Sequence, residues 1–262
     1  MSNEFFEQLC AAASRAGRKH TCFADSQAWQ TFCKALPRPQ ETPVAAATPE
    51  APHFPGVKQP ESPAPRPAVP SAGSLAALAG AVQNCQRCIL HQTRTYPVFG
   101  EGAENARLMF IGEGPGFEED RSGRPFVGRA GQLLDKMITA MQFSRAEVYI
   151  CNVVKCRPPH NRSPMPEEAE CCIGYLREQI RLIQPEVIVL LGATAARFLL
   201  NTDSGITALR GRWFEYENIP VMPTFHPAYL LRNESSKREA WMDLQQVMAR
   251  FGKYHTPRPQ GN

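Results

Sequence analysis

The sequence predicts an α/β protein of three layers, in which helices cover both faces of a central, mostly parallel four-stranded sheet. From about Ser71 onward, short apolar runs of strand length alternate with longer segments of helical spacing. Alternation of this kind is typical of parallel sheets, because each crossover helix packs on a face of the sheet. Before Ser71 the composition changes, which predicts an N-terminal helical or disordered extension outside this fold.

The elements of this fold are bounded by recognisable end signals. The expected strands are Arg107–Ile111, Glu147–Val154, Val187–Leu191 and Pro220–Thr224, and the expected helices are Gly128–Met141, Pro166–Ile183, Ala193–Leu200 and Lys237–Phe251. Pro166 and the two glutamates after it suit a first helical turn, because proline lacks an N–H that would be unpaired there and acids favour that end. Ligands of parallel sheets bind at the carboxyl ends of the strands, so functional residues should follow strands.

Three regions divide the chain. Residues 1–36 contain two stretches of helical spacing, Glu4–Arg15 and Ser26–Leu36, but they are too few for a dependable core of their own. Residues 37–70 hold eleven of the 24 prolines and should form a flexible linker, because they lack the apolar surface to offset the entropy of ordering. Residues 71–262 form the predicted globular domain, for which the hydrophobic content of 43% is sufficient.

The overall composition excludes some classes of protein and leaves others open. The net charge of +4 is too small to identify an acidic partner. No apolar run is long enough to span a membrane, and the N-terminus lacks a basic and then apolar leader. We therefore expect a cytoplasmic protein without a membrane partner. In that reducing compartment, nine cysteines indicate thiols or metal ligands rather than disulfides.

Four cysteines have a spacing that suits metal ligands. Cys85 and Cys88 form a CxxC pair, and Cys156 and Cys172 follow with fifteen residues between them. This spacing fits an iron–sulfur cluster or a zinc ion, although a zinc ribbon prefers two tight pairs. The two pairs could also be unrelated to each other.

The other five cysteines are predicted to be ordinary thiols. Cys151 lies in an expected strand and should be buried as a small hydrophobe. Cys171 precedes Cys172 on a helix and therefore points about 100° away from it. The remaining three could form a second site with His20 but are expected to pack on helices; they are Cys10, Cys22 and Cys33.

A glycine-rich segment, Gly112–Asp120 (GEGPGFEED), follows the first strand. Its glycines fall as GxGxG and no helix is expected directly after them, so the segment departs from a dinucleotide-binding fingerprint. We interpret it as an open loop in which Gly112 and Gly114 let the backbone approach a ligand closely.

Four segments, in order between about Cys85 and Met248, together resemble the family-four uracil-DNA glycosylases. They are GEGPGFEEDRSGRPFVGRAGQLLDKM, YICNVVKCRPPHNRSPMPEEAECC, VIVLLGATAARFLL, and RGRW with IPVMPTFHPAYLLR. The resemblance implies a DNA repair enzyme that flips uracil out of DNA, hydrolyses its N-glycosidic bond and leaves an abasic site. It also implies a [4Fe-4S] cluster, which we expect to fix loops rather than to exchange electrons. The implied ligands are Cys85, Cys88, Cys156 and Cys172.

The resemblance implies that three residues bind the flipped base. Phe126 stacks on it, a contact worth about 1–3 kcal/mol whatever the base. The carboxamide of Asn152 accepts from uracil N3–H and donates to O4, whereas cytosine presents the opposite pattern. His226 donates toward O2, where negative charge develops as the bond breaks. Without the resemblance, the same residues would fit a core phenylalanine, a capping asparagine and a histidine that closes a turn.

Water activation is the step for which the usual residue is missing. The better-known uracil glycosylases carry an aspartate at the position of Gly114 and a thymine-excluding tyrosine at that of Gly116. We expect Glu113 to position the attacking water or to stabilise the sugar cation. Glu119 is a second carboxylate, which could brace the loop and Asn152.

Contacts to the DNA backbone are expected from helix ends and basic side chains. Gly192 precedes a helix whose N-terminal N–H groups favour an anion, and Thr194 and Arg129 are the side chains added to this phosphate contact. Arg157 and Arg162, in the loop after Cys156, could also touch the duplex backbone.

Several alternatives remain. Tyr229–Leu231 is either a wedge that fills the gap in the duplex or ordinary loop packing. The chain could also be a catalytically silent iron–sulfur protein that binds DNA or senses damage. Some relatives trap the abasic sugar through a histidine, but the loop around His160 lacks their longer basic insertion, so we expect His160 to be a surface residue. We expect a monomer in the bacterial cytoplasm and nucleoid that acts on uracil-containing DNA, with residues 1–70 available to bind a repair or replication protein.

Overall fold

The computed structural model describes residue 69 and residues 71–253. The two predicted N-terminal helices, most of the predicted linker, and residues 254–262 lie outside the described residues, so the division of the chain before Ser71 stays a prediction. No helix in the described part has both the length and the apolarity needed to cross a membrane.

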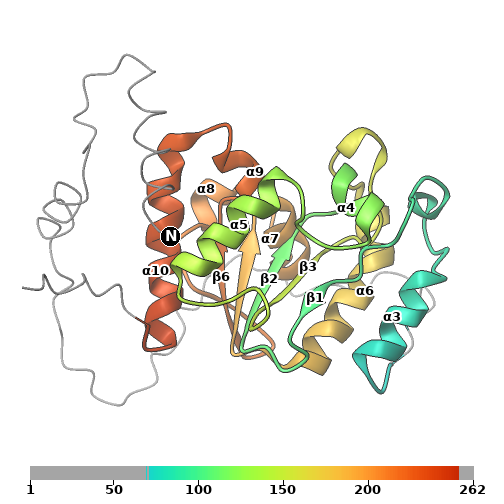
Figure 1. Ribbon diagram of the computed structural model, residues 1–262, viewed down its shortest axis with the longest axis horizontal. Helices are drawn as coiled ribbons and strands as arrows, with labels where there is room; N and C mark the ends of the chain where they lie inside the picture. The colour runs from blue at the N-terminus through green and yellow to red at the C-terminus, as the bar shows by residue number, and fades with distance from the viewer. Residues whose placement is uncertain (1–68, 70, 254–262) are drawn as a thin grey trace, which may run out of the picture. The chain divides into compact units, whose positions relative to one another are not determined.

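A mixed sheet of six strands lies at the centre of the described region, in the order β1-β3-β2-β4-β6-β5 (Figure 1). The four inner strands are parallel, which confirms the predicted core of the sheet; they are β3 (Tyr149–Asn152), β2 (Leu108–Gly112), β4 (Val187–Leu191) and β6 (Ile219–Thr224). The structure adds two antiparallel edge strands to the predicted four, β1 (Glu101–Gly102) and β5 (Phe214–Tyr216). Strands of two and three residues are too short for a recognisable alternation of apolar positions.

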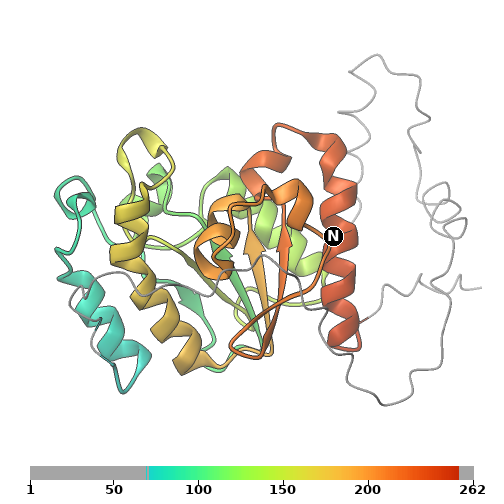
Figure 2. The same cartoon turned by 180° about the vertical axis from the view of Figure 1, so that it is seen from behind.

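Helices cover both faces of the sheet and give the three predicted layers (Figure 2). On one face these are α3 (Leu75–Gln83), α6 (Pro166–Ile183) and α7 (Ala193–Leu200); on the other they are α5 (Arg129–Ala140) and α10 (Lys237–Arg250). Successive side chains of β2 point to opposite faces of the sheet, since Met109 packs with the first group of helices and Phe110 with the second. β2 and β4 are buried at every residue and are continuously apolar, as expected for strands covered on both faces.

The longer predicted elements agree best with the structure. The bounds of α6, β4 and α7 are those that the sequence predicts. The prediction omits α3 and several shorter helices, namely Ile89–Gln92, α4 (Phe117–Ser122), Pro159–Asn161, α8 (Ile206–Leu209), α9 (Pro227–Leu230) and Glu234–Ser236.

Helix α4 corrects the expectation that no helix follows the glycine-rich loop directly. It begins after Gly116, whose N–H donates to the carboxylate of Glu119 at 3.1 Å. It ends at Gly123, which adopts the left-handed φ of 69° that glycine tolerates best. A helix of six residues is too short to show helical periodicity, which is why the sequence did not indicate it.

A buried carboxylate ties the last helix to the sheet. Asp243 of α10 is 1% exposed, accepts a hydrogen bond from Thr224 Oγ1 at 2.6 Å and pairs with Arg210. Because Thr224 ends β6, this contact fixes the strand end that leads to His226.

Replacing Asp243 with alanine should lower the free energy of unfolding by about 3 kcal/mol, because Arg210 would keep its partly buried charge without a counter-ion. Urea and thermal unfolding of the variant and the parent protein measure this loss. Glu186→Ala is the matched control, since Arg107 and Glu186 form a similar two-bond pair with side chains 62% and 53% exposed. The control should change stability little, and equal losses in both variants would contradict the assignment.

Candidate active site and cysteine cluster

The carboxyl ends of the parallel strands bring the predicted catalytic residues to one edge of the sheet. β2 ends at Gly112, directly before Glu113, and Gly112 pairs in register with Asn152 at the end of β3. His226 follows β6 and packs on the loop after β4, where a Cβ built on Gly192 would lie 3.0 Å from His226 Cβ. The strand order therefore gathers residues that are far apart in the sequence.

The side chain of Asn152 is buried without a partner. It is 1% exposed, and neither its Oδ1 nor its Nδ2 makes a hydrogen bond within the described part of the chain. An unpaired buried polar group costs about 1–3 kcal/mol, so native proteins seldom keep two in one side chain without a reason. Asn152 Oδ1 can accept one hydrogen bond and the adjacent Nδ2 can donate another. The side chain therefore suits a ligand that presents a donor next to an acceptor.

Phe126 lies against this amide in a strained backbone conformation. Its φ of 51° is in the left-handed region, which a bulky side chain rarely adopts outside functional sites. A Cβ on Gly112 would lie 2.5 Å from both Phe126 Cζ and Asn152 Oδ1, so only glycine leaves room for the two side chains to meet. The Phe126 ring also lies 5.7 Å from the His226 ring, centroid to centroid.

Arg145 holds the strained turn from outside. Its guanidinium donates to the main-chain oxygens of Phe126 at 3.3 Å and Pro125 at 2.5 Å, and it pairs with Asp135 at 2.6 Å. The sequence analysis did not identify Arg145. An arginine nineteen residues after the phenylalanine carries no local signal that could have indicated the contact.

Glu119 braces the same turn from the glycine-rich loop. Its carboxylate accepts hydrogen bonds from Gly116 N at 3.1 Å and from Val127 N and Gly128 N at 2.9 Å each. The predicted bracing role therefore links α4 to the segment that carries Phe126. Among the described residues no hydrogen bond joins Glu119 to Asn152.

The imidazole of His226 has a defined tautomer. Ala228 N donates to its Nδ1 at 3.1 Å, so the proton of the neutral ring lies on Nε2. Burial lowers the pKa of His226 below its ordinary value, and the nearby carboxylate of Glu113 only partly opposes this. A neutral ring with an Nε2–H donor is thus available at neutral pH.

Glu113 is held by Thr194, a residue that was expected to contact a DNA phosphate. The hydroxyl of Thr194, in the first turn of α7, donates to the Glu113 carboxylate instead of being free for the expected phosphate contact. The main-chain oxygen of Glu113 accepts from Val154 N at 3.1 Å. Gly114 packs closely on Val154, since a Cβ there would lie 2.7 Å from Val154 Cγ2. Thr194 therefore orients a carboxylate that has a second oxygen for water.

The arginines expected to touch DNA differ in their availability. Arg129 is exposed at the first residue of α5. Arg162 is held by Glu168 through two hydrogen bonds of 2.8 and 2.7 Å. Arg157 lies over the ring of Phe117, which is 47% exposed, with its guanidinium carbon 5.1 Å from the centroid. Of the last two, Arg157 is better placed for a phosphate.

The segment after His226 divides between core and surface. Leu230 is 2% exposed and belongs to a small core cluster, against which Leu231 also packs. Tyr229 is 38% exposed and stacks on Phe225 with centroids 4.9 Å apart. Any wedge formed in this conformation would therefore use Tyr229 rather than Leu230.

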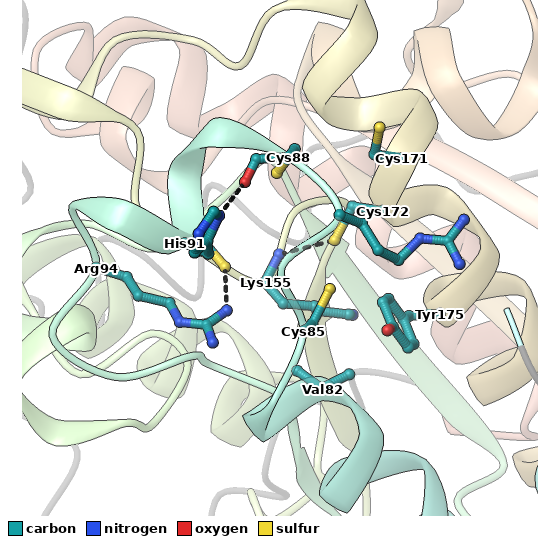
Figure 3. Close-up of a pocket in the computed structure, with 11 residues that line it drawn as sticks. Val82, Cys85, Cys88, His91, Arg94, Lys155, Cys171, Cys172 and Tyr175 are labelled. Carbon is teal, nitrogen blue, oxygen red and sulfur yellow. Dashed lines mark hydrogen bonds between the residues drawn. The ribbon is translucent and has the colours of Figure 1, made fainter. Parts of the chain in front are cut away.

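The four cysteines predicted as ligands line one pocket (Figure 3), so the alternative that the two pairs are unrelated is not supported. Cys85 and Cys88 come from the loop after α3, Cys156 follows β3, and Cys172 lies in α6. Burial raises the pKa of Cys172 to about 12 and also raises those of Cys88 and Cys156. Such thiols ionise readily only when a cationic centre binds them.

Two observations indicate what kind of centre these residues fit. Arg94 Nη1 donates to Cys156 Sγ at 3.0 Å and Lys155 N donates to Cys172 Sγ at 3.3 Å, as suits sulfur that carries negative charge. A zinc ion requires all its thiolates about 2.3 Å from one point, and no three potential ligands converge in that way among the described residues. The four thiols and the two N–H donors are compatible with a cluster of several irons, whose ligands need not meet at one atom.

The remaining predicted thiols and loop residues are placed as follows. Cys151 is fully buried in β3, which confirms its prediction as a small hydrophobe. Cys171 lines the same pocket, but Figure 3 shows its sulfur pointing away from Cys85 and Cys172. This agrees with the angle of about 100° between consecutive residues such as Cys171 and Cys172 on a helix. His160 is exposed, as predicted. The other cysteines and the histidine grouped with them lie outside the described residues: Cys10, Cys22, Cys33 and His20.

Comparison with known proteins gives a family for this chain. The family model described as the uracil DNA glycosylase superfamily matches residues 99–245. A type-4 uracil-DNA glycosylase of Thermotoga maritima is 52% identical over 158 residues, which span 60% of this chain and 82% of the relative. Those of Archaeoglobus fulgidus and Sulfurisphaera tokodaii are 41% and 42% identical over 180 and 183 residues, each 66% of this chain and 90% and 83% of the relative.

The lowered pKa of His226 predicts a pH dependence of stability. Below about pH 6.5 the unfolded chain binds a proton at this residue that the folded protein resists, so the free energy of unfolding falls as the pH falls. The slope cannot exceed about 1.4 kcal/mol per pH unit for one proton. His226→Gln removes this contribution, so in urea unfolding its stability relative to the parent should rise as the pH is lowered from roughly 7.5 to 5.5, a range around the ordinary histidine pKa. His160→Gln, made at an exposed position, is the control and should keep the parent's pH dependence.

Proposed function

The chain belongs to the type-4 family of the uracil-DNA glycosylase superfamily, and from this premise we propose that it hydrolyses the N-glycosidic bond of uracil in DNA and leaves an abasic site. The observation that carries the proposal is the buried, unpaired amide of Asn152. In this proposal Asn152 Oδ1 accepts from uracil N3–H and Nδ2 donates to O4. Cytosine presents a donor where uracil has O4, so the same amide rejects it.

The base must leave the duplex to reach an amide that is 1% exposed. Phe126, whose ring lies beside both Asn152 and His226, supplies the face on which the base stacks. Stacking favours any flipped base by about 1–3 kcal/mol, so identity depends on the amide and not on the ring.

Cleavage separates charge, and two residues are placed to stabilise it. As the bond between C1′ and N1 breaks, the sugar becomes cationic and uracil anionic. The Nε2–H of His226 donates to O2, where the negative charge develops. Glu113, oriented by Thr194, accepts a hydrogen bond from the water that adds to C1′, and the proton lost by that water balances the charge of the departing uracil.

We also propose that Cys85, Cys88, Cys156 and Cys172 hold a [4Fe-4S] cluster. The shared pocket and the N–H donors directed at two of the sulfurs support this assignment. When bound, the cluster would supply a rigid cross-link among the three segments that carry these cysteines.

Asn152→Ala should abolish most of the activity on a labelled oligonucleotide with one uracil, as seen after alkaline strand scission. We expect kcat/KM to fall about 100-fold or more, because the variant loses two hydrogen bonds of about 1–3 kcal/mol each. Its melting temperature should not fall correspondingly, because the substitution also removes two unpaired buried groups. The same oligonucleotide with thymine is the substrate control.

A folded parent protein that cuts no uracil would overturn the proposal and favour a DNA-binding protein without catalysis. Undiminished cutting by Asn152→Ala would leave the enzyme class intact but remove Asn152 from base recognition.

Arg145→Met should lower kcat/KM about tenfold or more, mainly through a higher KM, because the strained turn of Phe126 loses two charge-assisted hydrogen bonds. Arg124→Met is the matched control. Arg124 also pairs with Glu101, at 2.7 Å, and within the described residues its guanidinium hydrogen bonds go to Glu101 and not to the main-chain oxygens of Phe126 or Pro125. Equal effects of the two substitutions would show that loss of the Glu101 pair, and not of the turn contacts, is responsible.

A further inference from the structure

Lys155 is a buried lysine between the base-reading strand and the cysteine pocket. It is 1% exposed, lies three residues after Asn152 and directly precedes Cys156. Lys155 has no role in the proposed mechanism. Lysine is almost never fully buried unless its charge is paired, so its position requires an explanation.

The ammonium group donates to two neutral oxygens. Its Nζ lies 2.7 Å from the main-chain oxygen of Asn152 and 2.6 Å from Oε1 of Gln179. Among the ion pairs of the described residues, none joins Lys155 to a carboxylate. These two hydrogen bonds to neutral groups occupy two of the ammonium donors, and they leave the buried positive charge without compensation, which is costly in a protein interior.

The cysteine pocket can supply the missing negative charge. Lys155 lines this pocket with the four predicted ligands, and its main-chain N–H donates to Cys172 Sγ at 3.3 Å (Figure 3). Lys155 also directly precedes Cys156, so the residue that carries the positive charge is next to two of the four predicted ligands. Four thiolates around an iron–sulfide core carry a net negative charge, and this charge would offset that of Lys155.

The same ammonium fixes the backbone that presents the unpaired amide. The second acceptor, Gln179 of α6, is itself held by donating to Phe99 O at 2.9 Å and to Tyr149 Oη at 3.0 Å. Lys155 Nζ is therefore anchored on one side by α6 and on the other by the end of β3. The unpaired Asn152 amide can recognise a base only if it is held in a fixed position relative to the hydrogen-bonding edge of that base.

We propose that Lys155 is the counter-ion of the thiolate cluster site and the positioning residue through which that site holds Asn152. This inference rests on the proposed function and on the proposed cluster. It makes both the cluster site and the position of Asn152 depend on Lys155. The negative charge of the occupied cysteine site holds the ammonium in place, and the ammonium holds the Asn152 carbonyl in place.

The test compares holo-enzymes purified without oxygen, with iron content, cluster reduction potential and kcat/KM measured for each. Lys155→Met keeps the length of the side chain but removes its charge. We expect a lower reduction potential, because a nearby positive charge favours the reduced cluster, and a kcat/KM at least tenfold lower at equal iron content. Gln179→Met is the matched control: it removes one hydrogen bond of the ammonium but keeps the charge, so the potential should stay near that of the parent.

Gln179→Glu separates the two parts of the inference and serves also if Lys155→Met fails to fold. It places a carboxylate against the ammonium and keeps the hydrogen bond to Asn152. The reduction potential should fall as in Lys155→Met, while kcat/KM falls less than in Lys155→Met, because the ammonium stays on the Asn152 carbonyl.

An unchanged potential in Lys155→Met and Gln179→Glu would overturn the counter-ion role, as would a parent protein that binds no iron. A lowered potential with parental kcat/KM in Lys155→Met would overturn the positioning role. Absence of uracil cleavage by the parent would instead overturn the proposed function, and the potentials would still decide the counter-ion role.

Discussion

The register of the parallel strands is the constraint on which the candidate site depends. Gly112 pairs with Asn152, and Leu191 pairs with Thr224, so the ends of all four inner strands lie at one edge. A slip of one residue would turn the Asn152 side chain to the other face of the sheet. The continuous apolar runs of β2 and β4, buried on both faces, hold this register, so the position of the candidate site depends on the packing of these strands.

The site itself is locally unfavourable, and the surrounding structure maintains it. Phe126 keeps a left-handed backbone and Asn152 keeps two unpaired polar atoms, each of which would relax in an isolated segment. Arg145 and Glu119 hold the turn of Phe126 from opposite sides through its carbonyl and N–H groups. Such strain at a site that must meet one base edge is consistent with pre-organisation, because the reorganisation is completed during folding instead of during binding.

Local signals in the sequence account for the predicted parts of the fold, and contacts distant in the sequence account for the rest. α6 and β4 were predictable because each is long or apolar enough to show its period and has clear ends. The strand β1 and the helix α4 were not, since each is held by contacts that local periodicity does not reveal. For the site, the resemblance indicated residues that follow strands. It did not reveal Arg145, whose partners depend on how the chain folds.

For Thr194 the sequence predicted the position of the residue but not the partner of its hydroxyl. The sequence places this residue correctly at the start of a helix after β4, where an anion is favoured, and the expected anion was a DNA phosphate. In the fold the anion nearest to that hydroxyl belongs to the protein, since it donates to the Glu113 carboxylate. The N-terminal turn of α7 therefore stabilises the negative charge of Glu113. A carboxylate oriented in this way suits the proposed role of holding water beside a sugar that becomes cationic, so the start of α7 would act through Glu113 in the proposed mechanism.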